Sequence, residues 1–281
     1  MKIRWLILAI VVIALVLCAC GADDDAEETT PSDAGDSQLA LYSDNNCALS
    51  LQSVGKDGAG DYCWTVQMEN KTGNPLVFTV DQVYVNDYEA DPGWAQIAPA
   101  MATTASAISW PSSTLDACGI RSVDRVDFLL TVSPNRDGTD PIVQEKLTFY
   151  PNGEEAYQPA SFTAGAGDTV LIDEPETLLF AATGTDPDGE GGYTLNVYLE
   201  NRSESEQDYT VKNVKINGQI CDPSWYRTIE AGKKSFTYIN WYTEALQHME
   251  IYEVSKIEFD LVATDAATQM KTFEQHCVVE P

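Results

Sequence analysis

Apolar and polar residues alternate along several short stretches of the chain. Residues 62–68 place Tyr62, Trp64, Val66 and Met68 at every second position, and residues 193–199 show the same alternation. A period of two puts successive side chains on opposite faces of a strand, so each stretch predicts a β-strand with one buried face. A turn rich in Asn, Gly, Pro or Ser follows each strand.

These two stretches belong to a tandem duplication. Asn70 and Asn201 lie 131 positions apart, and the register continues without a gap from residues 47/178 to 132/263. In this register the sequence Asp-Pro-Gly-Trp at 91–94 returns as Asp-Pro-Ser-Trp at 222–225. A repeat of this length corresponds to a whole domain, because solenoid units are roughly 20 to 50 residues long.

One apolar stretch in each copy changes phase halfway. Phe78 and Val80 are followed by Val83 and Val85, and residues 209–216 repeat this odd step. Both pairs can stay buried only if the strand carries a bulge or crosses from one sheet to another. We expect the Asp-Pro-x-Trp stretch just beyond to be the corner where the chain crosses between sheets. The tryptophan would pin this corner, that is, fix it in place by packing against the core.

Turn signals and further apolar stretches complete the predicted fold. Asn86-Asp87 and Asn217-Gly218 are tight hairpin signals. More strands are expected at 107–110, 126–130 and 147–149, and in the second copy at 238–241, 257–261 and 272–273, whereas only 112–117 and 243–249 look helical. Six or seven short strands in about 115 residues predict an all-β fold with two tandem immunoglobulin-like β-sandwich domains. The domains are expected at 39–150 and 169–281, with a polar, Gly- and Ala-rich linker at 151–168.

The N-terminus has the organisation of an export signal. Lys2 and Arg4 precede an apolar run, residues 5–19, that is too short to cross a bilayer comfortably. The run ends in Leu-Cys-Ala-Cys-Gly at 17–21, which resembles the lipobox of bacterial lipoproteins. The resemblance implies a signal peptide at 1–19 and a diacylglycerol thioether on Cys20, hence a lipid-anchored, extracytoplasmic protein of the bacterial cell surface. An ordinary signal peptide or a retained membrane anchor is the alternative.

Residues 20–38 follow as an acidic segment. After Cys20 they contain no basic and no aromatic residue, so they cannot build a core and predict a disordered tether. A flexible chain of this length would span roughly 23 Å.

The net charge and the cysteines bear on two questions, whether the protein binds nucleic acid and whether it forms disulfides. The formal net charge of -28 would repel a phosphate backbone, so nucleic acid is not an expected partner. The two copies do not share the positions of their cysteines, which favours buried free thiols over one or two bridges. The five concerned are Cys47, Cys63, Cys118, Cys221 and Cys277.

A second similarity rests on short motifs of the second copy. They are Tyr-Thr-Leu at 193–195, Glu-Asn-Arg-Ser at 200–203, Val-Lys-Ile-Asn-Gly at 214–218, Cys-Asp-Pro-Ser-Trp at 221–225, Ala-Gly-Lys-Lys at 231–234 and Ile-Asn-Trp at 239–241. In these motifs the chain resembles a largely uncharacterised class of bacterial surface lipoproteins with immunoglobulin-like repeats. The resemblance implies export and a β-sandwich, and it brings no catalytic residues. The first copy lacks the Ala-Gly-Lys-Lys sequence, which weakens a functional role for the lysines, so we expect residues 231–234 to form a solvated turn.

Two sets of residues are candidates for binding. The loop tryptophans Trp94 and Trp225, with Asp91 and Asp222 beside them, could contact a glycan. A position kept in both copies is explained more simply as a packing requirement.

Alternating carboxylates form the second candidate. Asp186, Asp188 and Glu190 could hold Ca²⁺, although the loop lacks a distant bidentate glutamate and also reads as a solvated turn. No other cofactor is expected.

The sequence contains no nucleophile elbow, phosphate loop, zinc-protease motif or dinucleotide fingerprint. We therefore expect a non-catalytic binding or cell-envelope interaction module, held on the membrane by the lipid on Cys20. Its ligand could be an envelope component, a glycan or a protein. The alternatives are a glycan-binding module using the loop tryptophans, an enzyme with a site between the domains, and a structural spacer.

Overall fold

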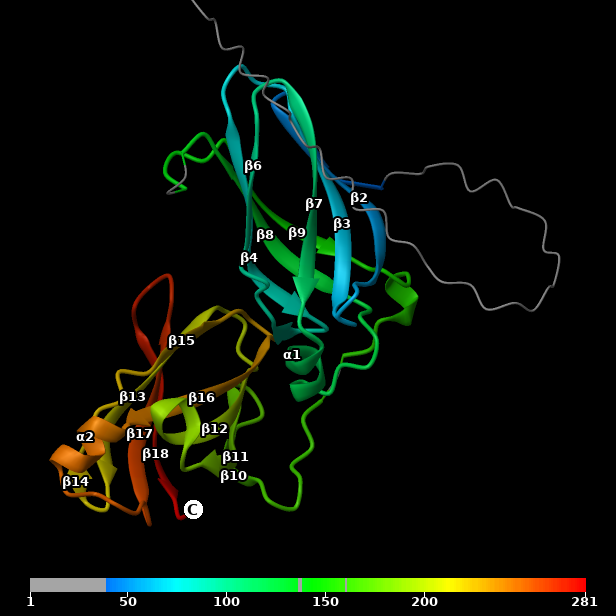
Figure 1. Ribbon diagram of the computed structural model, residues 1–281. Helices are drawn as coiled ribbons and strands as arrows, with labels where there is room; N and C mark the ends of the chain where they lie inside the picture. The colour runs from blue at the N-terminus through cyan, green and yellow to red at the C-terminus, as the bar shows by residue number, and fades with distance from the viewer. Residues whose placement is uncertain (1–38, 136–137, 160) are drawn as a thin grey trace, which may run out of the picture. The chain divides into compact units, whose positions relative to one another are not determined.

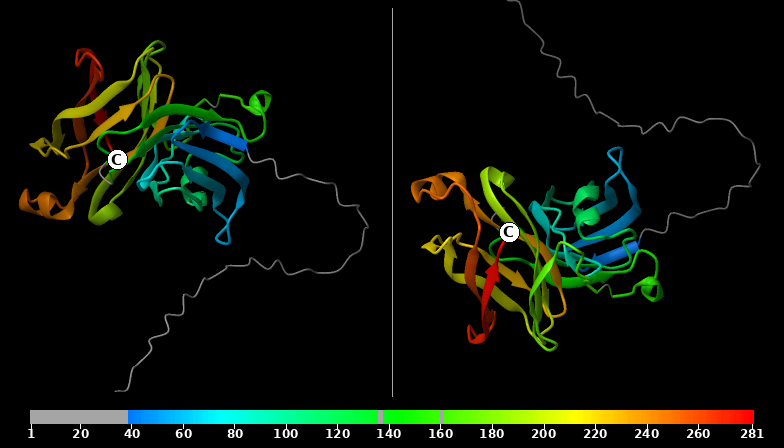
Figure 2. Two further views of the ribbon diagram at one scale, coloured as in Figure 1. Left: turned by 90° about the horizontal axis from the view of Figure 1, so that it is seen from above. Right: turned by 90° about the horizontal axis from the view of Figure 1, so that it is seen from below.

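The computed structural model of the chain describes residues 39–135, 138–159 and 161–281 (Figure 1, and Figure 2 for two further views). The expected signal peptide, Cys20 and the acidic tether lie outside the described residues. Gln38–Pro281 form one compact unit. Within the described ranges, no helix has the length and hydrophobicity needed to span a bilayer.

Within the described residues, the first copy and the segment after it contain nine strands, one helix and a 3-10 turn. In chain order they are β1 (Leu39–Ser43), β2 (Cys47–Lys56), β3 (Tyr62–Asn70), β4 (Leu76–Val85), β5 (Tyr88–Glu89), β6 (Trp94–Ala98), β7 (Ala102–Trp110), α1 (Ser112–Ala117), β8 (Val126–Ser133), β9 (Val143–Phe149) and η1 (Glu154–Ala156).

The second copy repeats this order. Its elements are β10 (Thr169–Asp173), β11 (Leu178–Asp186), η2 (Gly189–Gly191), β12 (Gly192–Asn201), β13 (Gln207–Ile216), β14 (Gln219–Ile220), β15 (Tyr226–Ile229), β16 (Lys234–Tyr242), α2 (Thr243–His248), β17 (Ile257–Asp265) and β18 (Lys271–Val279). Both predicted helices are present, whereas the short strands β5, β6, β14 and β15 raise the number of strands above the six or seven expected.

Each copy is a sandwich of two antiparallel sheets. In the first copy β1-β2-β3-β7 forms one sheet, and β5-β4-β8-β9 forms the other, with β6 paired to β4. The second copy has the matching orders β10-β11-β12-β16 and β14-β13-β17-β18, with β15 on β13. Trp64 packs edge-on against Phe128 between the sheets, and Phe180 meets Phe259 in the second copy. The all-β class is confirmed, and the packed open sheets agree with an immunoglobulin-like sandwich.

The duplication extends to unusual backbone conformations. Positive φ angles recur 131 positions apart, mostly at turns. The pairs are Gly60/Gly191, Gln82/Asn213, Asn86/Asn217, Asp87/Gly218, Gly93/Ser224, Met101/Gly232, Gly119/Glu250 and Gly138/Gln269. Several of these positions carry a residue other than glycine in at least one copy, so the local fold imposes the conformation despite its steric cost.

The phase change in the fourth strand is a β-bulge. The register of β4 with β8 shifts between Asp81 and Tyr84, and that of β13 with β17 shifts between Lys212 and Lys215. β4 stays in one sheet throughout, so of the two predicted alternatives the bulge is confirmed.

The Asp-Pro-x-Trp stretch is not the place where the chain changes sheets. β5 and β6 both pair with β4, so residues 90–93 only interrupt one sheet edge. The crossing comes after β6, in the turn before β7, because β6 pairs with β4 and β7 with β3. The predicted corner was therefore placed several residues too early.

One parallel pairing joins the two sandwiches. Lys234 of β16 pairs with Tyr88 of β5, which merges the second copy's first sheet with the first copy's second sheet. Aromatic rings cover this join. The ring of Tyr88 stacks on that of Phe236 with centroids 5.7 Å apart, and Phe162 stacks on Tyr198 at 4.1 Å.

Residues 151–168 are therefore more than a polar spacer. Phe162 packs in the junction, and the hydroxyl of Tyr157 donates a hydrogen bond to the carboxylate of Asp87. The polar, Gly- and Ala-rich composition of the segment gave no indication that these two side chains would pack in the junction.

A buried ion cluster lies beside the joining strands. Nζ of Lys233 is 2.8 Å from Oδ1 of Asp87 and also contacts Asp127, while Nε of Arg125 lies 3.0 Å from Asp127. The Lys234 amide donates to the carbonyl oxygen of Asp87 over 2.9 Å. Lys233 and Lys234 are only 7% and 4% exposed, so the prediction of a solvated Ala-Gly-Lys-Lys turn was wrong. Of the two equivalent turns, the one that carries the lysines packs against the other sandwich.

The five cysteines of the described residues are free thiols, as the sequence favoured. Cys47, Cys118, Cys221 and Cys277 are buried, whereas Cys63 is half-buried. Burial raises the pKa of Cys47 and of Cys277 to about 12, which keeps these thiols protonated and unreactive at neutral pH.

Candidate functional site

Each sandwich has a pocket at the same end, beneath its short helix. The pocket of the first copy has a volume of about 540 Å³ and that of the second about 510 Å³. Both values lie within the roughly 300–1,000 Å³ typical of small-molecule sites. We call them the first and the second pocket. Their lining residues are drawn from the segments 54–62, 112–123 and 151–152 in the first copy, and from the segments 185–193 and 243–254 together with residue 281 in the second.

The helix above each pocket lies between a buried tryptophan, which precedes it, and a residue of positive φ, which follows it. It follows directly after Trp110 or Trp241, whose indole N–H donates to the carbonyl oxygen of Ala90 or Cys221 over 2.8 and 3.0 Å. A residue of positive φ, Gly119 or Glu250, lies two positions after the last residue of the helix.

The chain folds back under the helix immediately after this residue. The amide of Ile120 donates to the carbonyl of Leu115 over 2.9 Å, and Ile251 does the same to Leu246. As a result, two aliphatic side chains of each copy, Leu115 and Ile120 or Leu246 and Ile251, line the pocket.

The floor of the pocket is apolar and equivalent in the two copies. Tyr62, Leu115, Ile120 and Val123 line the first pocket. The second has Tyr193, Leu246, Ile251 and Val254 at the positions 131 residues later. A ligand that covered this floor would gain about 25 cal/mol for each Å² of apolar surface removed from water.

The two floor tyrosines differ in their hydrogen bonding. The hydroxyl of Tyr62 accepts a hydrogen bond from Nε1 of Trp64 over 3.1 Å. In the second copy Leu195 replaces this tryptophan, and the buried hydroxyl of Tyr193 has no hydrogen-bond partner among the described residues. Burial raises the pKa of Tyr193, an effect that the nearby Thr185 side chain offsets only in part.

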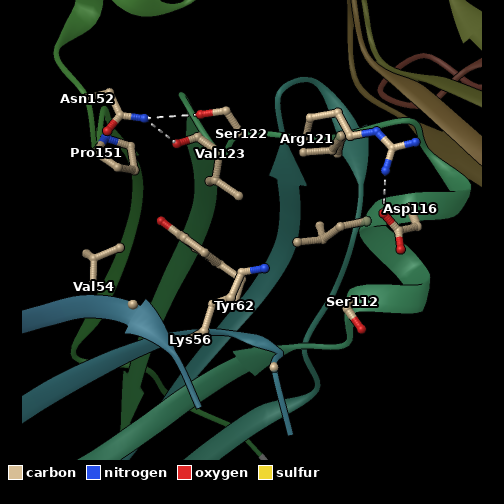
Figure 3. A pocket seen from close by; sticks show the side chains of 14 residues that line it. Val54, Lys56, Tyr62, Ser112, Asp116, Arg121, Ser122, Val123, Pro151 and Asn152 are labelled. Carbon is tan, nitrogen blue, oxygen red and sulfur yellow. Dashed lines mark hydrogen bonds and ion pairs between the residues drawn. The ribbon is translucent and has the colours of Figure 1, made fainter. Parts of the chain in front are cut away.

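The rim of the first pocket is polar and carries both signs of charge. Figure 3 shows Lys56 and Tyr62 projecting from the strands into the hollow, opposite Ser122 and Asn152. Asn152 is held in place because its amide donates to the carbonyl oxygen of Val123 over 3.2 Å.

An exposed ion pair completes this rim. Arg121 pairs with Asp116 at 3.3 Å, and both side chains are mostly in solvent. An exposed pair of this kind contributes about 0–1 kcal/mol, so its members can turn toward a ligand at small cost.

The second pocket has a rim of different composition. Asp188, Gln247, Tyr252 and Glu253 line it, together with Thr243. Lys56 is replaced by Pro187, Arg121 by Tyr252 and Ser122 by Glu253 in the 131-residue register. The floor is thus common to the two copies and the rim is not.

The tryptophans expected to contact a glycan are buried. Trp94 and Trp225 are 6% and 8% exposed and belong to the two hydrophobic cores. Nε1 of Trp94 donates to Oγ of Ser106 over 3.1 Å, whereas Thr237, the counterpart of Ser106, accepts instead from Arg227. A sugar ring could not reach either indole face without opening the core, which favours the pinning role.

Asp91 and Asp222 shape their own turns. Oδ1 of Asp91 accepts the amide of Gly93 over 2.7 Å, and Asp222 accepts that of Ser224 over 2.8 Å. Both carboxylates thereby fix the backbone of the residue immediately before the tryptophan.

The proposed calcium loop stays a prediction. Oδ1 of Asp186 accepts the amide of Asp188 over 3.1 Å, as in a simple turn, and the side chain of Glu190 lies outside the description. Within the described ranges, no group of three or more His, Cys, Asp or Glu side chains could hold a metal ion.

The ion cluster lies at the junction, the region in which the alternative of an enzyme site between the domains would fall. Burial alone would raise the pKa of Asp87, but hydrogen bonds from Lys233 and Tyr157 and the charges of Lys233 and Arg125 outweigh it and hold the pKa below the ordinary value. The adjacent cavity measures about 210 Å³. The ion pairs keep this carboxylate charged, and a separate hollow of about 710 Å³ lies at the same junction, so the enzyme alternative stays a prediction.

Sequence reasoning missed both pockets. Their lining residues come from separate segments, and no contiguous motif marks them. The available signal was the repeated pair of aliphatic residues after each short helix, at 115 and 120 and again at 246 and 251.

Comparisons with known proteins give no family. No family model and no curated protein matches the chain. Among solved structures it is similar to the Salmonella enterica SafA pilin in complex with the SafB chaperone, at 13% identity, covering 85% of this chain and 98% of that chain with a TM-score of 0.24.

Two further structures are similar at the same level. The red sea bream transglutaminase is 14% identical, with 83% of this chain and 31% of that chain covered and a TM-score of 0.20. A Porphyromonas gingivalis W83 protein of unknown function is 12% identical, with 83% and 99% covered and a TM-score of 0.19. At TM-scores this low, no function can be transferred from any of the three.

Proposed function

We propose that this chain is a non-catalytic binding protein, anchored outside the cytoplasm by a lipid on Cys20, that takes one small ligand group in each of its two pockets. The observation that carries the proposal is the recurrence of the pocket. Its apolar floor is retained side chain by side chain while the rim around it has changed. An apolar floor supplies binding energy, and a few polar rim groups supply orientation and specificity.

The anchor and the pockets suit a role in the cell envelope. Lipid on Cys20 would hold the chain at a membrane surface, and the acidic residues after it would act as a spacer. Ligands available there include short peptides, amino acids and sugars of the envelope. The junction of the two sandwiches holds both pockets on one compact unit.

The test uses residues 38–281, since this segment is a compact unit containing both cores. Protein with ¹³C-labelled Ile, Leu and Val methyl groups is titrated with amino acids, dipeptides, muropeptides and disaccharides. Methyl signals of Leu115 and Ile120 report on the first pocket, and those of Leu246 and Ile251 on the second. Shifts confined to these methyl groups, saturating with concentration, are expected for at least one of the molecules.

Matched variants close each pocket in turn. Ser112→Phe and Thr243→Phe place a ring at equivalent exposed rim positions, and each should abolish binding in its own pocket only. The neighbouring variants Ser113→Phe and Glu244→Phe, at exposed positions that do not line the pockets, should bind normally. If no molecule shifts the floor methyls, or if closing the mouth leaves binding unchanged, the proposed function is wrong.

A further inference from the structure

The two pockets carry opposite charge at their rims. The residues lining the first include two cations, Lys56 and Arg121, and one acid, Asp116. The residues lining the second include two acids, Asp188 and Glu253, and no cation. Because the duplication started from one sequence, this difference arose at the rim while the floor was kept.

Net charge alone cannot produce this difference. A chain with a formal charge of -28 attracts cations toward its whole surface. At physiological ionic strength, however, charges are screened beyond about 8 Å, so a bound ligand responds mainly to the nearest rim groups. Discrimination between the two pockets must therefore come from the few residues that differ.

A second feature of the second pocket also indicates a ligand. Tyr193 is 6% exposed and lines the pocket, and its hydroxyl makes no hydrogen bond of normal geometry with a described residue, although the side chain of Thr185 lies near it. A buried polar group without a partner is costly, so such groups are rare in folded proteins. A ligand with an N–H donor would supply the partner that Trp64 supplies to Tyr62 in the first copy.

We propose that the second pocket binds an ammonium-bearing molecule with an apolar body and that the first pocket rejects it. The body covers Leu246, Ile251 and Val254, and the ammonium group lies among Asp188, Glu253 and the hydroxyl of Tyr193. In the first pocket the same ammonium would face Lys56 and Arg121. The inference rests on the proposed function and specifies it further. The two copies then bind different ligands, in place of two repeats of a single one.

The experiment compares probes that share a body and differ in charge. Tryptamine and indole-3-propionate are titrated into methyl-labelled residues 38–281, with hexylamine and hexanoate as an aliphatic pair. Tryptamine should shift the Leu246, Ile251 and Val254 methyls and bind there on the order of ten-fold more tightly than indole-3-propionate, given two carboxylates and no cation at the rim. The Leu115, Ile120 and Val123 methyls should show no such preference for the amine.

Variants of the rim and floor test the assignment. Glu253→Gln should weaken tryptamine binding about two- to five-fold, as expected for the loss of one exposed ion pair. Glu145→Gln removes the same charge at an exposed position that lines neither pocket, and it should leave the affinity unchanged. Tyr193→Phe should weaken the amine without changing the binding of the acid.

The failures are distinguishable. If amine and acid bind the second pocket equally, or if both pockets prefer the amine to the same degree, the charge assignment is overturned while small-molecule binding stands. If tryptamine and hexylamine cause no shift at the Leu246, Ile251 and Val254 methyls at millimolar concentration, the assignment is also overturned. Absence of shifts in both pockets with every probe counts against the proposed function itself.

Discussion

Nζ of Lys233 lies 2.8 Å from a carboxylate oxygen of Asp87, although 146 positions of sequence separate them. Each side chain is only 8% exposed. Lys233 belongs to a turn of the second sandwich and Asp87 to a hairpin of the first. This pair, with Arg125 and Asp127 beside it, contributes to the junction that the β5–β16 pairing and the stacked aromatic rings also form.

Replacing Lys233 should uncouple the sandwiches. Lys233→Ala leaves the buried carboxylate of Asp87 with the hydroxyl of Tyr157 and, as its only cation, the more distant Arg125, and removing one partner of a buried ion pair typically costs about 3–5 kcal/mol. Urea denaturation of residues 38–281 should show this loss and a second transition as the domains unfold separately.

A matched control is available at the same junction. Lys146 pairs with Glu230 across the two copies at 2.8 Å, but its side chain is 64% exposed. Lys146→Ala should change stability by less than about 1 kcal/mol. Equal losses for the two variants would contradict a buried, energetically dominant Lys233.

Asp87 should make stability depend on acid pH. Its pKa in the folded protein lies below the ordinary value of 3.8, because its cationic and hydrogen-bonding partners outweigh burial. The carboxylate therefore contributes stability above that ordinary value, and the contribution disappears as pH falls through the lower folded-state pKa.

Free energies of unfolding measured from pH 6 to pH 2 should fall less steeply for Asp87→Asn than for the unmodified protein. Asparagine suits this site because it tolerates the positive φ of the hairpin. Asp116→Asn, which alters a carboxylate in solvent, serves as the comparison and should retain the steep profile. Parallel curves for the unmodified protein and Asp87→Asn would refute the assignment.

The floor tyrosines should respond oppositely to loss of their hydroxyls. Tyr193→Phe removes a buried group without a partner, so the ligand-free protein should be unchanged or stabilised by up to about 1 kcal/mol. Tyr62→Phe removes the acceptor for Nε1 of the fully buried Trp64 and should destabilise by about 1–2 kcal/mol. Thermal melting of the two variants side by side measures the difference, and a matching loss in both would mean that Tyr193 has a partner.

The lipid anchor predicts a specific dependence on one cysteine. When the full chain is produced in a bacterium that processes lipoproteins, Cys20→Ser should abolish incorporation of labelled palmitate and move the protein to the aqueous phase of a detergent partition. Cys18→Ser should retain the label, because Cys18 follows the bulky Leu17 and lies before the expected cleavage point. Labelling of Cys20→Ser would rule out the lipobox assignment.

The alternation of residues predicted most of the fold correctly because the side chains of a strand point to opposite faces whatever lies around it. Tyr62 to Met68 became β3, and the odd step between Val80 and Val83 became a bulge. The 131-residue register also predicted that both copies would share these features. The alternation of apolar and polar residues did not predict the short edge strands, because they have too few residues to show a period.

Neither the alternation nor the repeat predicted the two pockets. Trp94 and Trp225 stood out in the sequence, yet they fill the cores, while the pockets are lined by residues that a motif search passes over. Tyr157 and Phe162 lay in a segment whose composition indicated a linker, and both contribute to the junction.

Periodicity, turns and the duplication depend on neighbours within one segment, so the chain's order of residues was sufficient to establish two all-β sandwiches with a common bulge and common hairpins. The joint between them and the two pockets depend on which surface covers which. Lys233 is a buried ion-pair partner only because the turn of one domain meets the hairpin of another. Tyr193 has a hydroxyl without a partner only because Leu195 stands where the other copy has a tryptophan. Contacts over such separations follow from the packing of whole sheets, which local sequence does not encode.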